Sequence, residues 1–68
     1  MITQTTYQQA VAAREAAAHA LYEAELAVHD AHQTGVDEWI SAAHRHLHAA
    51  IVQHSAALES VAAFELAA

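Results

Sequence analysis

The sequence predicts an all-α fold, an antiparallel two-helix hairpin (αα-hairpin). The chain of 68 residues has no proline and a single glycine, Gly35, near its middle. On both sides of Gly35 the residues are mostly strong helix formers such as alanine, glutamate, glutamine and leucine. We expect one domain, residues 1–68, with a first helix over about 5–33, a turn over 34–37 and a second helix over about 37–66.

The turn is predicted by signals on both sides of Gly35. Glycine commonly ends a helix because it adopts left-handed backbone angles at little steric cost. Asp37 is expected to be the N-cap of the second helix, and Glu38 adds further negative charge at its positive end. A single continuous helix with an internal glycine would lose only about 1 kcal/mol. The succession of a stop signal and a start signal favours the hairpin.

The first helix has a capping-box sequence at its start, either Thr5 with Gln8 or Thr6 with Gln9. Its large apolar residues share one broad arc with polar insertions: Tyr7, Val11, Leu21, Tyr22 and Val28. Alanines predominate on the opposite side: Ala13, Ala16, Ala20, Ala24, Ala27 and Ala31. Two interpretations of the alanines are open, because they can pack against a neighbouring subunit or simply face solvent.

The second helix has a regular apolar stripe with steps of mostly three and four residues, as in coiled coils. In an antiparallel hairpin the large residues of both helices would lie level along the contact. One such contact cannot enclose a core, so we expect two hairpins to pair as a four-helix bundle. Plasmid repressor-of-primer proteins have a similar outline, which is a topological analogy only. The expected core and oligomer interface comprises Tyr7, Val11, Leu21, Tyr22, Val28, Ile40, Leu47, Ile51, His54, Leu58, Val61 and Phe64.

His54 interrupts the apolar stripe with a polar side chain. A buried imidazole needs hydrogen-bond partners for its nitrogens. The favoured interpretation is a polar group that fixes the register of the bundle. The alternative is a pH-sensitive latch that loosens the bundle when the ring is protonated.

Seven histidines in so short a chain raise the question of a metal site. Glu25 and His29 are four residues apart, as are His44 and His48. Such spacings place side chains on one face of a helix, and imidazole suits Zn²⁺, Ni²⁺ and Cu²⁺. Glu25, His29, His44 and His48 therefore form a candidate site for a divalent transition metal, and no other cofactor is expected. The Glu-x-x-His pairs of di-iron bundles and the His-Glu-x-x-His motif are both missing from the sequence.

Composition excludes several classes of function. The formal net charge is −6, with two arginines and no lysine, which argues against binding nucleic acids or anionic membranes. No apolar run is long enough for a membrane span, and the first residues do not resemble a signal peptide, so a cytoplasmic protein is expected. There is no cysteine, no glycine-rich phosphate loop and no nucleophile motif. The alanine-rich, lysine-free composition fits a GC-rich genome, such as those of actinobacteria and their phages.

These observations favour a small non-enzymatic protein–protein interaction module that acts as a homodimer. It would bind an unknown protein partner, as a modulator or inhibitor. His32 and Trp39 lie near the turn and are the expected partner-binding tip. A metal-responsive or pH-responsive bundle is the alternative. A weaker one is a nucleic-acid-binding hairpin, which would need protonated histidines around Arg45.

Overall fold

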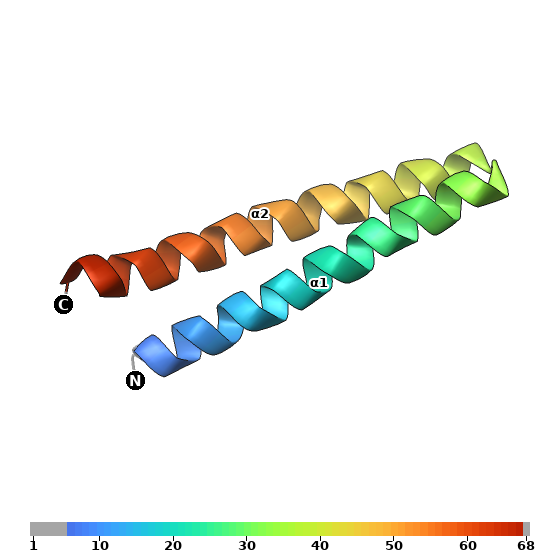
Figure 1. Ribbon diagram of the computed structural model, residues 1–68. Helices are drawn as coiled ribbons and strands as arrows, with labels where there is room; N and C mark the ends of the chain where they lie inside the picture. The colour runs from blue at the N-terminus through green and yellow to red at the C-terminus, as the bar shows by residue number, and fades with distance from the viewer. Residues whose placement is uncertain (1–5, 68) are drawn as a thin grey trace, which may run out of the picture.

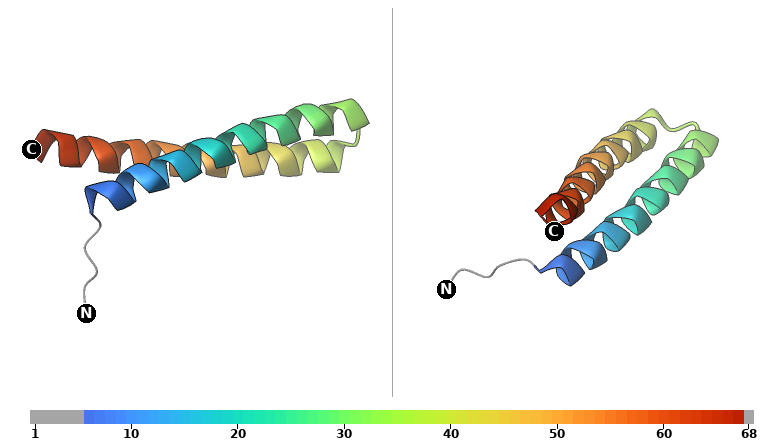
Figure 2. Two further views of the ribbon diagram at one scale, coloured as in Figure 1. Left: turned by 60° about the horizontal axis from the view of Figure 1, so that its bottom comes forward. Right: turned by 60° about the vertical axis from the view of Figure 1, so that its left-hand side comes forward.

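The computed structural model describes residues 6–67, and these residues form two antiparallel helices (Figure 1). α1 spans Tyr7–Thr34 and α2 spans Asp37–Ala67. No strand occurs in this part of the chain. The predicted all-α hairpin is therefore confirmed. The start of α1 and the end of α2 lie at the end of the hairpin opposite to the turn, and the helices cross at a shallow angle (Figure 2).

α1 begins with a complete capping box. The Thr6 hydroxyl accepts a hydrogen bond from the Gln9 backbone N–H at 3.1 Å, and the Thr6 N–H donates to Gln9 Oε1 at 2.9 Å. These two bonds satisfy donors that have no partner within the helix. The structure therefore uses the second of the two predicted frames, and Thr5 lies outside the described residues.

The turn is built on Gly35, which has a φ of 71° and donates its N–H to the His32 carbonyl at 3.3 Å. Thr34 supports it, because its hydroxyl donates to the Ala31 carbonyl at 2.6 Å and accepts from the Val36 N–H at 3.2 Å. The bend thus satisfies polar groups that the end of a helix leaves without partners.

The expected N-cap role of Asp37 is wrong. The Val36 carbonyl accepts the first helical hydrogen bonds of α2, from the N–H groups of Trp39 and Ile40. Val36, the residue directly after Gly35, therefore holds the cap position. Asp37 and Glu38 lie in the first turn, where their charges still stabilise the positive end of the helix.

The fully buried residues of the contact between the helices are mostly alanine, and we call this contact the alanine seam. The buried residues of α1 are Ala10, Ala17, Ala24 and Ala31. In α2 only Ala50 and Val61 are buried. The expectation that Ala24 and Ala31 lie away from α2 is therefore wrong. Because alanine carries a single methyl group, this seam lets the two backbones approach more closely than large side chains would.

The register pairs large residues with small ones across the seam. The rings of Tyr7 and Phe64 meet edge to face, with centroids 6.1 Å apart. Steps of one heptad along α1 and back along α2 then place Arg14 level with Ala57, Leu21 with Ala50, and Val28 with Ala43. The alanines of the α1 seam fall level with large or polar residues of α2: Ala10 with Val61, Ala17 with His54, Ala24 with Leu47, and Ala31 with Ile40. This alternation keeps the space between the helices evenly filled.

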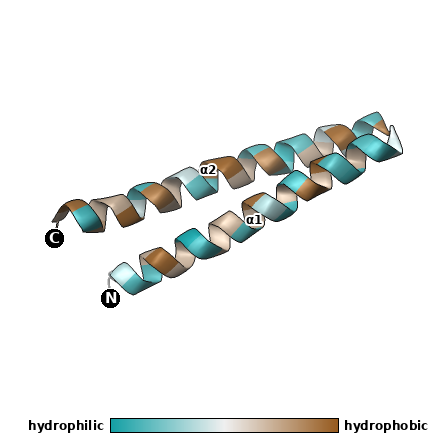
Figure 3. Cartoon of the chain, in the orientation of Figure 1, coloured by the Kyte–Doolittle hydropathy of each residue, from teal (hydrophilic) through white to brown (hydrophobic). Residues whose placement is uncertain are grey.

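Several large residues remain outside the seam. Tyr22 is 58% exposed, and Ile51 and Leu58 are each 45% exposed. The hairpin alone therefore leaves these three partly uncovered, and their place in the predicted core and oligomer interface stays a prediction. Figure 3 shows that apolar residues recur along the whole length of α2.

Candidate functional site

One broad side of the hairpin collects large aliphatic residues from both helices. Ile51 and Leu58 follow His44 at steps of one heptad, so the three lie on one flank of α2. Val11 lies on the flank of α1 that carries His32 for the same reason. Because His32 and His44 meet across the hairpin, these flanks form one continuous face.

We call this surface the aliphatic face and define it by Val11, Leu21, Leu47, Ile51 and Leu58. Val11, Leu21 and Leu47 are half-buried, whereas Ile51 and Leu58 are exposed. All five belong to the predicted core and oligomer interface. The hairpin alone covers them only in part, so the predicted oligomer contact stays a prediction.

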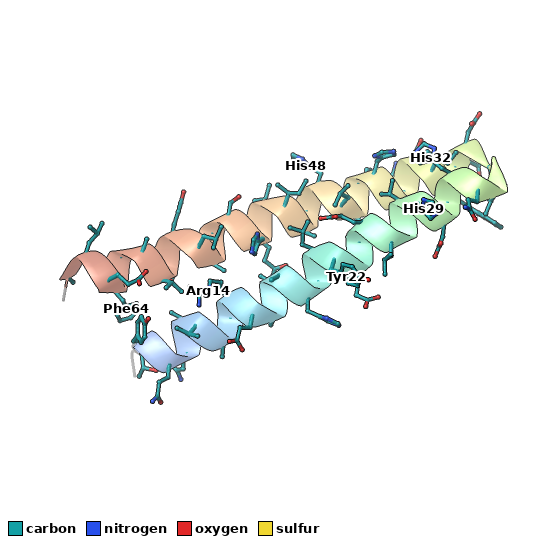
Figure 4. All side chains as sticks on the ribbon, viewed as in Figure 1. Arg14, Tyr22, His29, His32, His48 and Phe64 are labelled. Carbon is teal, nitrogen blue, oxygen red and sulfur yellow. The ribbon has the colours of Figure 1, made fainter. Side chains whose placement is uncertain are left out.

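Polar side chains interrupt the aliphatic face at a few positions. Arg14 and His54 are half-buried along the seam, and Glu25 is exposed on the same flank as Val11. In the view of Figure 4 the Arg14 side chain extends into the space between the two helices. Within residues 6–67 no carboxylate lies within ion-pair distance of Arg14, because the one such pair there joins His19 to Glu23 at 3.7 Å. Arg14 and Glu25 thus present opposite charges that the hairpin does not pair.

Near the turn, two histidines from different helices are in direct contact. The Nε2 atoms of His32 and His44 lie 3.0 Å apart, and the rings meet edge to face with centroids separated by 5.2 Å. Both side chains are exposed. In a neutral pair, one nitrogen donates the hydrogen bond and the other accepts it.

The structure does not assemble the predicted metal site. No group of three or more histidine, aspartate or glutamate side chains lies close enough to hold an ion anywhere in residues 6–67. His29 hydrogen-bonds Gln33 at 3.2 Å instead, and His48 points away from α1 (Figure 4). His44 has His32 as its neighbour rather than Glu25. Glu25 is exposed, and within residues 6–67 no ion pair or hydrogen bond joins it to any of these histidines.

Sequence reasoning assigned His32 to a partner-binding tip and missed its contact with His44. The spacing from His29 to His32 gave a hint, but only the register of the hairpin identifies the partner. Trp39, the other predicted tip residue, is 59% exposed beside the turn. It therefore does not cap the hairpin core, and its role in binding stays a prediction.

The rest of the chain adds no further constraint on function. Between residues 6 and 67, neither helix combines the length and apolar character that crossing a membrane requires. Comparison with protein-family models, with curated proteins and with solved structures gave no significant match.

Proposed function

We propose that this protein is a non-enzymatic protein–protein interaction module whose working unit is a homodimeric four-helix bundle. The observation that supports this most strongly is the core of the hairpin. Among the described residues, Val61 is the one large side chain that is fully buried, at 1% exposure, and every other buried residue is alanine. Burying an alanine methyl group contributes only about 0.8 kcal/mol. A chain of this size needs a further source of stability, and pairing of aliphatic faces would supply it.

The dimensions of the hairpin suit a second copy as the occupant of this face. The molecule measures 48 Å by 24 Å by 14 Å, so its broad side spans 48 Å by 24 Å. A standard stable interface takes roughly 800 Å² from each partner, which fits within that side. Pairing would cover Ile51 and Leu58 and complete the burial of Leu21 and Leu47. It would also make the contact isologous, as in most homodimers.

Charge complementarity favours a two-fold arrangement with the turns at opposite ends. Arg14 lies about two helical turns from the start of α1, and Glu25 lies about two and a half turns from its end. The two-fold axis of this arrangement lies between the two paired faces, at mid-length and perpendicular to the helices. It therefore brings Arg14 of each hairpin close to the level of Glu25 of its partner. Two symmetric ion pairs would then form between charges that the single hairpin leaves apart.

Charge reversal tests this arrangement directly. Arg14→Glu and Glu25→Arg would each place like charges level with one another, and each should raise the dimer dissociation constant by about tenfold or more. The double variant restores opposite charges and should recover most of the lost affinity. Sedimentation equilibrium over a dilution series measures all three dissociation constants.

Glu59→Arg is the matched control, because Glu59 is exposed on the side of α2 away from the aliphatic face. It makes the same change in net charge as Glu25→Arg and should leave dimerisation nearly unchanged. A monomer at all concentrations of the unmodified protein would overturn the homodimer. Equal effects of Glu59→Arg and Glu25→Arg would overturn the proposed pairing.

The same dimer leaves an acidic outer surface for a second protein. The net charge of −6 per chain favours a partner with a basic surface and disfavours nucleic acid, whose affinity depends on lysine and arginine. The exposed Trp39 ring beside the turn is the largest apolar group that such a partner could bury.

A further inference from the structure

The contact between His32 and His44 joins the two helices near the turn through side chains alone. It sets two ring nitrogens 3.0 Å apart. Two nitrogens bound to one tetrahedral zinc ion, each at 2.0–2.1 Å, lie about 3.3 Å apart. The pair therefore has nearly the separation that a shared metal ion requires, and both rings must tilt so that each Nε2 points at the ion instead of at the other nitrogen.

We propose that His32 and His44 form a cross-helix chelate for a divalent transition metal such as Ni²⁺, Cu²⁺ or Zn²⁺. The ion would replace the hydrogen bond between the two Nε2 atoms. Each ring would then bind the ion through the lone pair of its neutral Nε2 and carry its proton on Nδ1. The proton that now bridges the pair moves to Nδ1 of the same ring through solvent, so the rings release no net proton.

The site would have two protein ligands and open positions filled by water. No third metal-ligating side chain joins the pair within residues 6–67. Both rings are exposed, so an ion can enter without opening the hairpin. With imidazole ligands the order of affinity should place Cu²⁺ above Ni²⁺ and Zn²⁺.

Such an ion would tie α1 to α2 beside the turn and stabilise the hairpin, since the unfolded chain does not hold these two residues together. Both ligands belong to one chain, so metal binding needs no second copy, although the pair lies at the turn end of the side that the proposed homodimer would cover. Metal binding can therefore succeed where dimerisation fails.

The rival arrangement lies within α2 alone. His44 and His48 are four residues apart, and such a pair on an exposed helix can also chelate an ion. The two sites share His44 but differ in their second ligand, which is His32 in the cross-helix site and His48 in the rival. Substitution of these two residues therefore distinguishes the two sites.

Titration with Ni²⁺ by calorimetry, together with thermal unfolding followed by circular dichroism, tests the proposal. The unmodified protein should bind one ion per chain saturably, and its melting temperature should rise by about 5 °C or more at saturation. His32→Gln and His44→Gln should each weaken binding by about tenfold or more and abolish the shift. His48→Gln should retain both the binding and the shift.

His46→Gln is the control for non-specific binding to surface histidines, because His46 lies on the other flank of α2. Helical content without metal checks that each variant folds. Unsaturable heat with the unmodified protein would overturn the proposal. It would also be overturned if His48→Gln abolished binding while His32→Gln left it intact, because the ion would then sit on α2 alone.

Discussion

The alanine seam makes a specific prediction about Ala24. This residue is 0% exposed and lies level with Leu47 on α2. Leucine at this position would add three carbon atoms at a level that already holds one large side chain. Because the neighbouring levels are paired in the same way, the extra volume can be accommodated only if the helices move apart.

The magnitude follows from the cost of overpacking. Extra methylene groups in a well-packed core destabilise a protein by about 1–3 kcal/mol. A chain of 68 residues has a total unfolding free energy of about 3–10 kcal/mol. A loss of about 2 kcal/mol would therefore lower the melting temperature by about 8–16 °C. Helix propensity does not offset this loss, since leucine and alanine are both strong helix formers.

The assay is thermal and urea unfolding of Ala24→Leu at a fixed protein concentration, because pairing would make stability depend on concentration. Ala27→Leu is the control, since Ala27 lies one turn further along α1 and is exposed. It should change the unfolding free energy by less than about 0.5 kcal/mol. If Ala24→Leu and Ala27→Leu unfold at the same temperature, the alanine seam does not set the distance between the helices.

Two further predictions concern the turn and the aliphatic face. Gly35→Ala should lower the unfolding free energy by about 1–2 kcal/mol in urea titrations, because its φ of 71° is unfavourable for a side chain. Nothing lies within 4 Å of the added Cβ, so the loss would come from the backbone conformation and not from a clash. Asparagine tolerates this conformation better than alanine, so Gly35→Asn should lower the unfolding free energy by less. Equal losses for the two variants would contradict this explanation. Ile51→Asn should raise the dimer dissociation constant by about tenfold or more. Val52 is more exposed than Ile51 and faces away from the aliphatic face, so Val52→Asn should leave this constant nearly unchanged. Sedimentation equilibrium measures the dissociation constants of both variants. Equal constants for Ile51→Asn and Val52→Asn would show that Ile51 does not lie in the interface.

The sequence alone determined the helical hairpin and the location of its bend. These features depend on local chemistry, which acts within a few residues. Gly35 ends α1 because of its own backbone freedom, and Thr6 with Gln9 starts the same helix through bonds between their side chains and each other's backbone groups. The N-cap of α2 is Val36, one residue before the predicted Asp37, because the Val36 carbonyl accepts the first helical hydrogen bonds.

Only the tertiary structure decided which residues form the seam and which histidines meet. In α1 the buried alanines repeat every seven residues, and so do the half-buried Arg14, Leu21 and Val28 beside them. Both sets face α2 in the structure, where each of these alanines lies level with a larger residue of α2 and each of these larger residues lies level with an alanine. The sequence pattern alone does not give this pairing, because it depends on the register of the two helices. His32 and His44 come together through the register of two helices, which a shift of one residue would change. Local sequence does not encode that register, because it results from packing along the whole length of the seam.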